Sequence, residues 1–398
     1  MSSNYKDIGL QYEKTSGVKL NPRWSERSNI ILFYLGRQRL LRFASLHPDW
    51  ADIRVTESCN SRCMTCYAWK NKPEGELTTE EIKDALHQLK DIGVKNVVFI
   101  GGEPLLRSDI GVLVKEANLL EFENRIIVTN GLLLKDKAEE LLRNGITHIT
   151  VSIDGIGSTD DRIRGVPNSY VRSVEGIETV QRLKKNMGLN IPVTIITTIL
   201  LNQNVEEIPK LVELSRSLDA YWLFNLLDPN LDIFKGIPFS SLLVRSEGKI
   251  DETIDYLQKT CKKYPQPISS CDHMLEFARS YLKGENRYDF HCVHGYKMVY
   301  LGSHGEVYLG CYAMDPIGNI RKNKLREIVG SKKHRELAER MYMMECPGCT
   351  NRYEFNIAVK HLISHQFRCE KRRRKENPNV QHKQRSPIHD GEKLKKEA

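Results

Sequence analysis

The chain contains, directly after a short apolar run at 53–56, the sequence Cys59-Asn60-Ser61-Arg62-Cys63-Met64-Thr65-Cys66, with three thiols within eight residues. The apolar run predicts a β-strand, and the active sites of parallel α/β folds gather at the carboxyl ends of strands. Three thiolates on one such loop can hold three irons of a [4Fe–4S] cluster and leave the fourth iron open for a ligand. The alternative is a structural zinc ion with a distant fourth ligand.

The segment that follows alternates between strand and helix patterns. Strand-like runs occupy 53–56, 96–100, 126–129, 148–153, 193–200 and 221–227, and helix-period segments follow Thr78 and cover 109–120, 136–144, 170–185 and 205–218. Thr78 and Glu81 form a capping-box signature at the start of the first helix. Such alternation predicts right-handed βαβ units and a parallel sheet. Periodicity alone leaves open whether the six strands form an open sheet or a partial barrel.

The second predicted strand ends in Gly101-Gly102-Glu103-Pro104. Paired glycines allow a ligand to approach the backbone, and carbonyl groups at a strand end can accept hydrogen bonds from an ammonium group. A simple turn is the alternative for this tetrapeptide alone. Its position one βαβ unit after a three-cysteine loop favours the ligand-binding interpretation.

The CX3CX2C loop after the first strand, followed by this tetrapeptide after the second, resembles the radical S-adenosylmethionine (SAM) superfamily. The resemblance covers roughly residues 50–228 and implies a partial (β/α)6 TIM-like barrel. It also implies a cluster that binds the amino and carboxylate groups of SAM at its open iron. One electron, expected from a flavodoxin or ferredoxin-type donor, splits SAM and yields a 5′-deoxyadenosyl radical that abstracts hydrogen from the substrate.

The same resemblance implies roles for individual residues. Cys59, Cys63 and Cys66 match the cluster ligands, and Gly101 to Pro104 match the segment that receives the methionyl ammonium group. The remaining expected SAM contacts are a turn residue at the end of strand three (Asn130), a serine and an arginine for the carboxylate (Ser152, Arg164), an acidic residue for the ribose (Asp154) and backbone near the adenine (Tyr67). For Ser152, Asp154 and Arg164, the alternative is a helix cap or an exposed charge. Thr65 stands where many members have an aromatic residue.

A second cysteine set, Cys292, Cys311, Cys346 and Cys349, lies beyond the barrel. With a hairpin pattern at 298–301 and 307–309 around Gly302-Ser303-His304-Gly305, it resembles the twitch domain, a shortened relative of SPASM domains. The resemblance implies a smaller C-terminal α+β domain with one auxiliary [4Fe–4S] cluster. Four thiolates leave no open iron, which suits electron transfer or a structural role.

The last two cysteines allow a competing interpretation. Cys346 and Cys349, with His361 and His365, come one residue short of a C2H2 zinc finger, and a basic tail follows. That pattern would describe an iron–sulfur or zinc protein that binds nucleic acid. It would leave Cys292 and Cys311 without a role, so we expect the cluster and no nucleic-acid partner.

The whole-chain composition sets the remaining expectations. With 40% hydrophobic and 28% charged residues in 398, the chain can bury a large core. No apolar run of about 18 residues and no signal sequence are present, so we expect no transmembrane segment and a cytoplasmic protein. Much of the net charge of +9 lies in the last 31 residues. We predict an N-terminal extension (1–50), a radical SAM core (51–228), a helical connection (229–290), a twitch/SPASM-like domain (291–367) and a basic, disordered tail (368–398). The substrate, a small molecule or a peptide, is not indicated by any residue.

Overall fold

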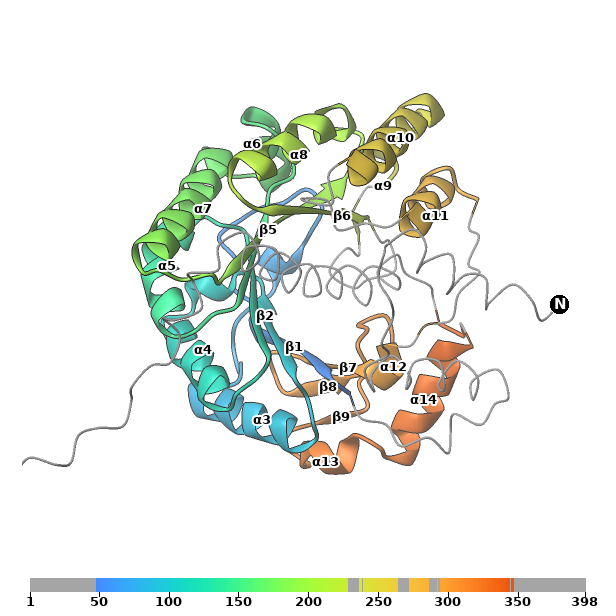
Figure 1. Ribbon diagram of the computed structural model, residues 1–398. Coiled ribbons are helices and arrows are strands. Elements are labelled where there is room, and N and C mark those ends of the chain that lie inside the picture. The colour runs from blue at the N-terminus through green and yellow to red at the C-terminus, as the bar shows by residue number, and fades with distance from the viewer. Residues whose placement is uncertain are drawn as a thin grey trace, which may run out of the picture.

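The computed structural model describes residues 48–227, 236–237, 239–263, 272–285, 292, 294–343 and 345–346 (Figure 1). A nine-stranded sheet curves through the molecule in the order β6-β5-β4-β3-β2-β1-β7-β8-β9. The strands are β1 (Trp50–Thr56), β2 (Asn96–Gly101), β3 (Asn124–Thr129), β4 (His148–Ser152), β5 (Val193–Leu200), β6 (Tyr221–Leu226), β7 (Met298–Leu301), β8 (Glu306–Tyr308) and β9 (Gly318–Asn319).

Helices form an arc around the convex face of this sheet (Figure 1). Those of the strand–helix repeat are α3 (Thr79–Asp91), α4 (Ile110–Leu119), α5 (Leu134–Arg143), α6 (Ser158–Arg164), α7 (Ser169–Asn186) and α8 (Ile208–Ser217), with short 3-10 turns η2 (Ala68–Lys70), η3 (Pro104–Leu106) and η4 (Val205–Glu207). The later helices are α9 (Phe239–Leu242), α10 (Glu247–Lys263), α11 (Asp272–Leu282), α12 (His294–Lys297), α13 (Leu325–Ile328) and α14 (Lys332–Tyr342).

The partial barrel predicted from the resemblance is confirmed. Strands β1 to β6 are all parallel and paired in chain order. The capping box is also confirmed, because the Thr78 side chain accepts from the Glu81 N–H and Glu81 accepts from the Thr78 N–H. No prediction was made for α6, which lies between β4 and α7.

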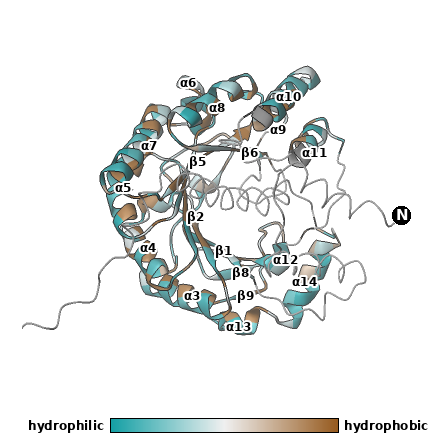
Figure 2. Ribbon diagram, in the orientation of Figure 1, coloured by the Kyte–Doolittle hydropathy of each residue, from teal (hydrophilic) through white to brown (hydrophobic). Residues whose placement is uncertain are grey.

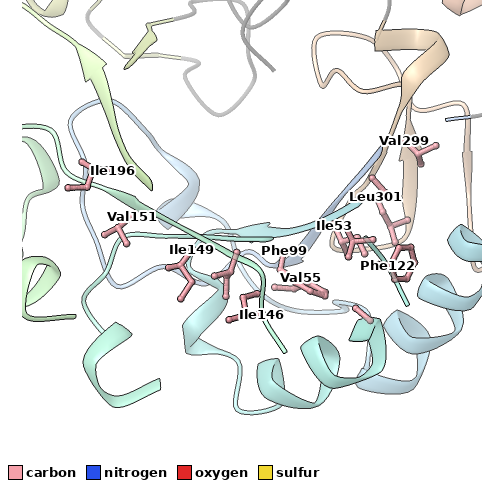
Figure 3. Packing of buried hydrophobic residues seen from close by; sticks show 14 of the residues in the cluster. Ile53, Val55, Phe99, Phe122, Ile146, Ile149, Val151, Ile196, Val299 and Leu301 are labelled. Carbon is pink, nitrogen blue, oxygen red and sulfur yellow. The ribbon is translucent and has the colours of Figure 1, made fainter. Parts of the chain in front are cut away.

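Alternate side chains point to opposite sides of each strand. Apolar side chains lie on both faces of the sheet. On the convex face, Ile53, Phe99 and Ile149 belong to the main core, which the helices cover. Figure 3 shows Val55, Phe99 and Ile149 between the strands and the helices. On the concave face, Trp50 and Met298 join a smaller apolar cluster. The helices in turn show hydrophilic residues beside hydrophobic ones, as expected for one buried and one exposed face (Figure 2).

The C-terminal region extends the barrel's own sheet, a pairing that the sequence did not indicate. Strand β7 pairs in parallel with β1, with Trp50 opposite Met298 and Ile53 opposite Leu301. Strands β8 and β9 then continue antiparallel, which confirms the hairpin. Because β7 covers the free edge of β1, backbone groups that would otherwise lack partners are hydrogen-bonded.

Several predictions fall outside the described residues. These are the extension up to residue 47, parts of the helical connection, Cys349, the two histidines of the zinc-finger interpretation and the basic tail. The domain boundaries therefore stay predictions. Among the described residues, no helix combines the length and apolarity needed to cross a membrane.

Candidate active site

The three cysteines lie on a loop that leaves the carboxyl end of β1, here called the cysteine loop (residues 57–67). The Cys63 side chain is buried, and those of Cys59 and Cys66 are half-buried. Two backbone hydrogen bonds flank Cys63 on either side: Arg62 N–H donates to the Arg164 carbonyl and Met64 N–H to the Ile163 carbonyl, both at 2.9 Å. The end of α6 therefore supports the loop.

Each of the three sulfur atoms accepts one hydrogen bond. Ser61 N–H donates to Cys59 Sγ and Ala68 N–H donates to Cys66 Sγ, each at 3.4 Å, and Arg164 Nη1 donates to Cys63 Sγ at 3.9 Å. Burial raises the pKa of all three thiols, that of Cys63 to about 12, so iron must supply the positive charge that makes them thiolates.

The donor set fits a cluster. All three donors are thiols, the ligands that iron–sulfur clusters use. In the described part of the chain, no three Cys, His, Asp or Glu side chains converge closely enough for a single metal ion. In a cluster each thiolate binds a different iron, so the three sulfur atoms need not converge on one point. The all-thiol donor set therefore suits a [4Fe–4S] cluster.

The glycine pair after β2 lies against the cysteine loop. Gly102 N–H donates to the Thr56 carbonyl and Glu103 N–H to the Ser58 carbonyl, both at 2.7 Å. A Cβ atom on Gly101 would lie 2.5 Å from Thr56 O, and one on Gly102 would clash with Ser58 O. The missing side chains of these glycines leave room for the backbone of residues 56–58. The sequence had instead led us to expect a ligand in that space. Their contact with SAM stays a prediction.

Glu103 joins the ends of β2 and β3. Its side chain is buried, and its carboxylate accepts from Leu105 N–H at 3.0 Å, Thr129 Oγ1 at 2.7 Å and Asn130 N–H at 2.7 Å. Burial raises its pKa even though these hydrogen bonds lower it. Pro104 is buried and opens η3.

Asn130 connects the turn after β3 to the cysteine loop. Its side-chain Nδ2 donates to Asn60 Oδ1 at 2.7 Å and to Ser61 Oγ at 2.9 Å. Its Oδ1 accepts from Leu132 N–H at 3.0 Å. Asn130 therefore lies at the cysteine loop and contacts the loop itself. Its contact with SAM stays a prediction.

The residues expected to meet the SAM carboxylate and ribose lie around α6. Ser152 ends β4 and is half-buried, and its hydroxyl makes no hydrogen bond within the described residues. Asp154 is completely buried and its Oδ2 lies 2.8 Å from Arg164 Nη2. Asp160, which was not predicted as a site residue, is also fully buried beside Arg164. The direct SAM contacts of these residues stay predictions.

Burial and mutual charge shift the pKa values of Asp154, Asp160 and Arg164. Burial raises the pKa of Asp154, although Arg164 opposes the shift, and raises that of Asp160 to about 6. Burial by itself would lower the pKa of Arg164, but Asp154, Cys63 and Asp160 raise it above its ordinary value. The guanidinium is therefore a permanent cation.

A cavity of about 670 Å³ opens between the cysteine loop and the β7–β8 hairpin. On its wall, Arg54 pairs with Glu57 at 2.6 Å, and the Ser303 hydroxyl donates to the same carboxylate at 2.5 Å. Although burial alone would raise the pKa of Glu57, Arg54 and the hydrogen bonds lower it. Tyr67 also lines the cavity, with Lys70 Nζ 3.6 Å from its ring centroid.

The second cysteine set is described for three of its four members. Cys292 is buried just before α12, Cys311 is half-buried after β8, and Cys346 is half-buried after α14. Helices α12 and α14 pack together, because His334 Nε2 lies 2.8 Å from the Gly295 carbonyl oxygen. Cys349 is outside the described residues, so the four-cysteine ligand set stays a prediction.

Comparison with known proteins finds family matches for two segments of the chain. Residues 53–215 match the radical SAM superfamily, and residues 292–350 match an iron–sulfur cluster-binding domain, SPASM. The second match ends before His361 and His365, so the nucleic-acid-binding alternative finds no support.

Two curated relatives and one solved structure show how far the similarity extends. An AdoMet-dependent heme synthase of Methanosarcina barkeri is 29% identical over 69% of this chain and 80% of its own length. A pre-heme d1 synthase of Dinoroseobacter shibae is 31% identical over 44% of this chain and 42% of its own length. The structure of Streptococcus suis SuiB bound to its precursor peptide SuiA shares the fold, with a TM-score of 0.60, 16% identity, and coverage of 83% of this chain and 77% of that one.

The matched segments contain the features described above. The first holds the three-cysteine loop and the strand ends that support it, and the second holds the hairpin and the later cysteines. Together they imply SAM and [4Fe–4S] clusters as cofactors. Residues 53–215 are therefore a radical SAM domain, and residues 292–350 are a SPASM-like iron–sulfur domain.

Proposed function

We propose that this radical SAM enzyme reductively cleaves SAM and abstracts hydrogen from a small molecule or peptide held in the cavity beside the cysteine loop. The observation that carries the proposal is the position of Cys59, Cys63 and Cys66 on one loop, with all three sulfur atoms hydrogen-bonded. When bound, the cluster supplies the electron that splits SAM into methionine and a 5′-deoxyadenosyl radical. The outcome is an oxidation, a cyclisation or a peptide maturation, so the activity is oxidoreductase-like.

The protein's own residues would hold SAM against this loop. Among the described residues the Ser152 hydroxyl, at the carboxyl end of β4, has no hydrogen-bond partner, and it would bind the SAM carboxylate. The strand end at Gly101–Pro104 would receive the ammonium group, and backbone near Tyr67 the adenine. Asn130 keeps the cysteine loop in place through Asn60 and Ser61.

The cavity is the proposed substrate site because it adjoins both the cysteine loop and the SPASM-like hairpin. Its wall combines a buried ion pair, Arg54 with Glu57, and aromatic rings such as Tyr308. Such walls orient a substrate through a few polar groups and exclude water elsewhere. The relatives named above include enzymes of heme synthesis and a protein that binds a precursor peptide, so both substrate classes stay within the proposal.

The cofactors lead to proposals for the auxiliary cluster, the electron donor and the cellular compartment. An auxiliary [4Fe–4S] cluster held by Cys292, Cys311, Cys346 and Cys349 would transfer electrons or support the fold. A flavodoxin or ferredoxin-type donor would supply the reducing electron. Thiolate-bound clusters require a reducing compartment, which favours the cytoplasm.

The test measures 5′-deoxyadenosine by chromatography after anaerobic reconstitution and reduction with dithionite. The parent should form it, and Cys63→Ala should not, because two thiolates cannot keep three irons ligated and one open. Cys261→Ala is the matched control, since this cysteine lies on α10, far along the chain from the loop. Formation at the parent rate by Cys63→Ala would disprove the proposal.

A further inference from the structure

Arg164 lies at the end of α6 with its guanidinium among three acidic groups. Only 8% of the residue is exposed. Its Nη2 is 2.8 Å from Asp154 Oδ2, its Nε is 3.9 Å from Asp160 Oδ1, and its Nη1 donates to Cys63 Sγ at 3.9 Å. One permanent cation therefore faces two carboxylates and one cysteine sulfur in the protein interior.

The surroundings fix this cation in place. Asp154 Oδ1 accepts from Ile199 N–H on β5, and Asp160 Oδ1 accepts from Asp154 N–H, each at 2.7 Å. At the other end of the residue, the Arg164 carbonyl accepts from Arg62 N–H next to Cys63. The next residue, Gly165, has φ +66° and no room for a Cβ atom, which would meet the Arg62 carbonyl. The backbone of α6 and that of the cysteine loop are thus in direct contact.

This arrangement argues against a free guanidinium. Turning Arg164 toward a further carboxylate would leave Asp154 buried without its cation, and breaking a buried ion pair in this way is strongly unfavourable. The contact with Cys63, by contrast, requires no rearrangement. The sulfur is within reach while the ion pair with Asp154 remains intact.

We propose that Arg164 is a positioning residue for Cys63, whose sulfur its guanidinium contacts, and that its buried positive charge raises the reduction potential of the bound cluster. The inference rests on the proposed function, in which Cys63 is a cluster ligand. A reduced cluster carries one more negative charge than an oxidised one, and a nearby buried cation stabilises the more negative state. Asp154 and Asp160 keep that cation from moving.

The experiment compares Arg164→Gln with the parent, both carrying Cys311→Ala to simplify the signal from the auxiliary site. A redox titration with dithionite, followed by electron paramagnetic resonance without SAM, gives the midpoint potential, and each reduction adds one electron without making or breaking a bond. SAM affinity is measured separately by equilibrium dialysis, and iron content is measured in every preparation. We expect a lower midpoint potential in Arg164→Gln and a change in SAM affinity below about threefold.

Two further variants make the result specific. Arg162→Gln removes the same charge from the exposed side of α6 and should leave the potential unchanged. Arg164→Gln combined with Asp154→Asn leaves no unpaired carboxylate at the Asp154 position, so it should fold where the single variant fails, and it should also show the lower potential.

Three outcomes would overturn the inference. An unchanged potential with a loss of SAM affinity of about tenfold or more would show that Arg164 binds the SAM carboxylate. An equal shift of the midpoint potential in Arg162→Gln would show that the effect comes from the protein's overall charge and not from the position of Arg164. An unchanged potential together with unchanged SAM affinity would show that Arg164 influences neither. A parent that holds no cluster on the cysteine loop would instead disprove the proposed function itself.

Discussion

The side-chain amide of Asn130 donates a 2.9 Å hydrogen bond to Ser61 Oγ across a separation of 69 residues. The turn after β3 thereby reaches the middle of the cysteine loop, between Cys59 and Cys63. A loop in water would sample many conformations, so each such bond lowers the entropy lost when the thiols take up iron.

Asn130→Ala should loosen the cysteine loop. The variant loses both donor bonds and leaves Leu132 N–H without its acceptor, which should cost about 1–3 kcal/mol of stability. Iron retention during gel filtration after reconstitution should fall below that of the parent. Asn186→Ala, at the exposed end of α7, is the control and should retain iron normally. Equal retention in Asn130→Ala would show that the loop holds its shape without this residue.

Gly102→Ala should disrupt the junction between β2 and the cysteine loop. Its methyl group would meet the carbonyl oxygen of Glu57 at 2.5 Å, and backbone cannot move aside as a flexible side chain can. We expect a loss of at least about 2 kcal/mol in the unfolding free energy, with reduced iron incorporation. Gly248→Ala, on the exposed face of α10 with only Ser246 Oγ nearby at 3.8 Å, should stabilise the protein slightly. A folded, fully loaded Gly102→Ala protein would contradict the packing described here.

The two glycines illustrate what the sequence could and could not predict. The motif located the right segment at the right strand end, because strand–helix alternation and the position of Gly101 and Gly102 are local properties of the chain. Which group fills the space beside them is a tertiary property. The pattern favoured a ligand, and the structure places the backbone of residues 56–58 there.

Other misses have the same origin. Helix α6 spans only Ser158–Arg164 and is mostly polar, so it has too few turns to show an apolar period. Its last residue, Arg164, and the Asp154 that pairs with it were recognised only through the family resemblance. By contrast, the capping box at Thr78 was predicted and found, because capping depends on residues three apart.

Stability should fall at acid pH through His148. Burial, reinforced by Arg125, lowers the pKa of this imidazole from 6.5 to about 4. The unfolded chain therefore takes up the proton first, and stability present above pH 6.5 is lost as the pH falls toward about 4. The free energy of unfolding, measured with urea, should fall in the parent by on the order of 1 kcal/mol per pH unit more than in His148→Gln in this window. Parallel pH profiles for the two proteins would contradict the assignment.

The auxiliary site should account for half of the iron. Reconstituted parent should hold about eight irons, and Cys292→Ala or Cys311→Ala about four. Either variant should still form 5′-deoxyadenosine without substrate, because the cysteine loop is intact, and should turn over substrate poorly. The measurements are colorimetric iron analysis and the chromatographic assay. A parent with about four irons and stoichiometric zinc would refute the auxiliary cluster.

Strand β7 shares four consecutive residue pairs with β1, the strand from which the cysteine loop departs. The strand that leads into the cysteine loop and the first strand of the SPASM-like hairpin are therefore joined directly by peptide hydrogen bonds. Relative motion of these two strands would require rupture of that ladder, so the distance between the start of the cysteine loop and the SPASM-like hairpin is fixed by the backbone. A chimaera that imports the C-terminal half of a relative should work only if the relative's β1 is imported with it.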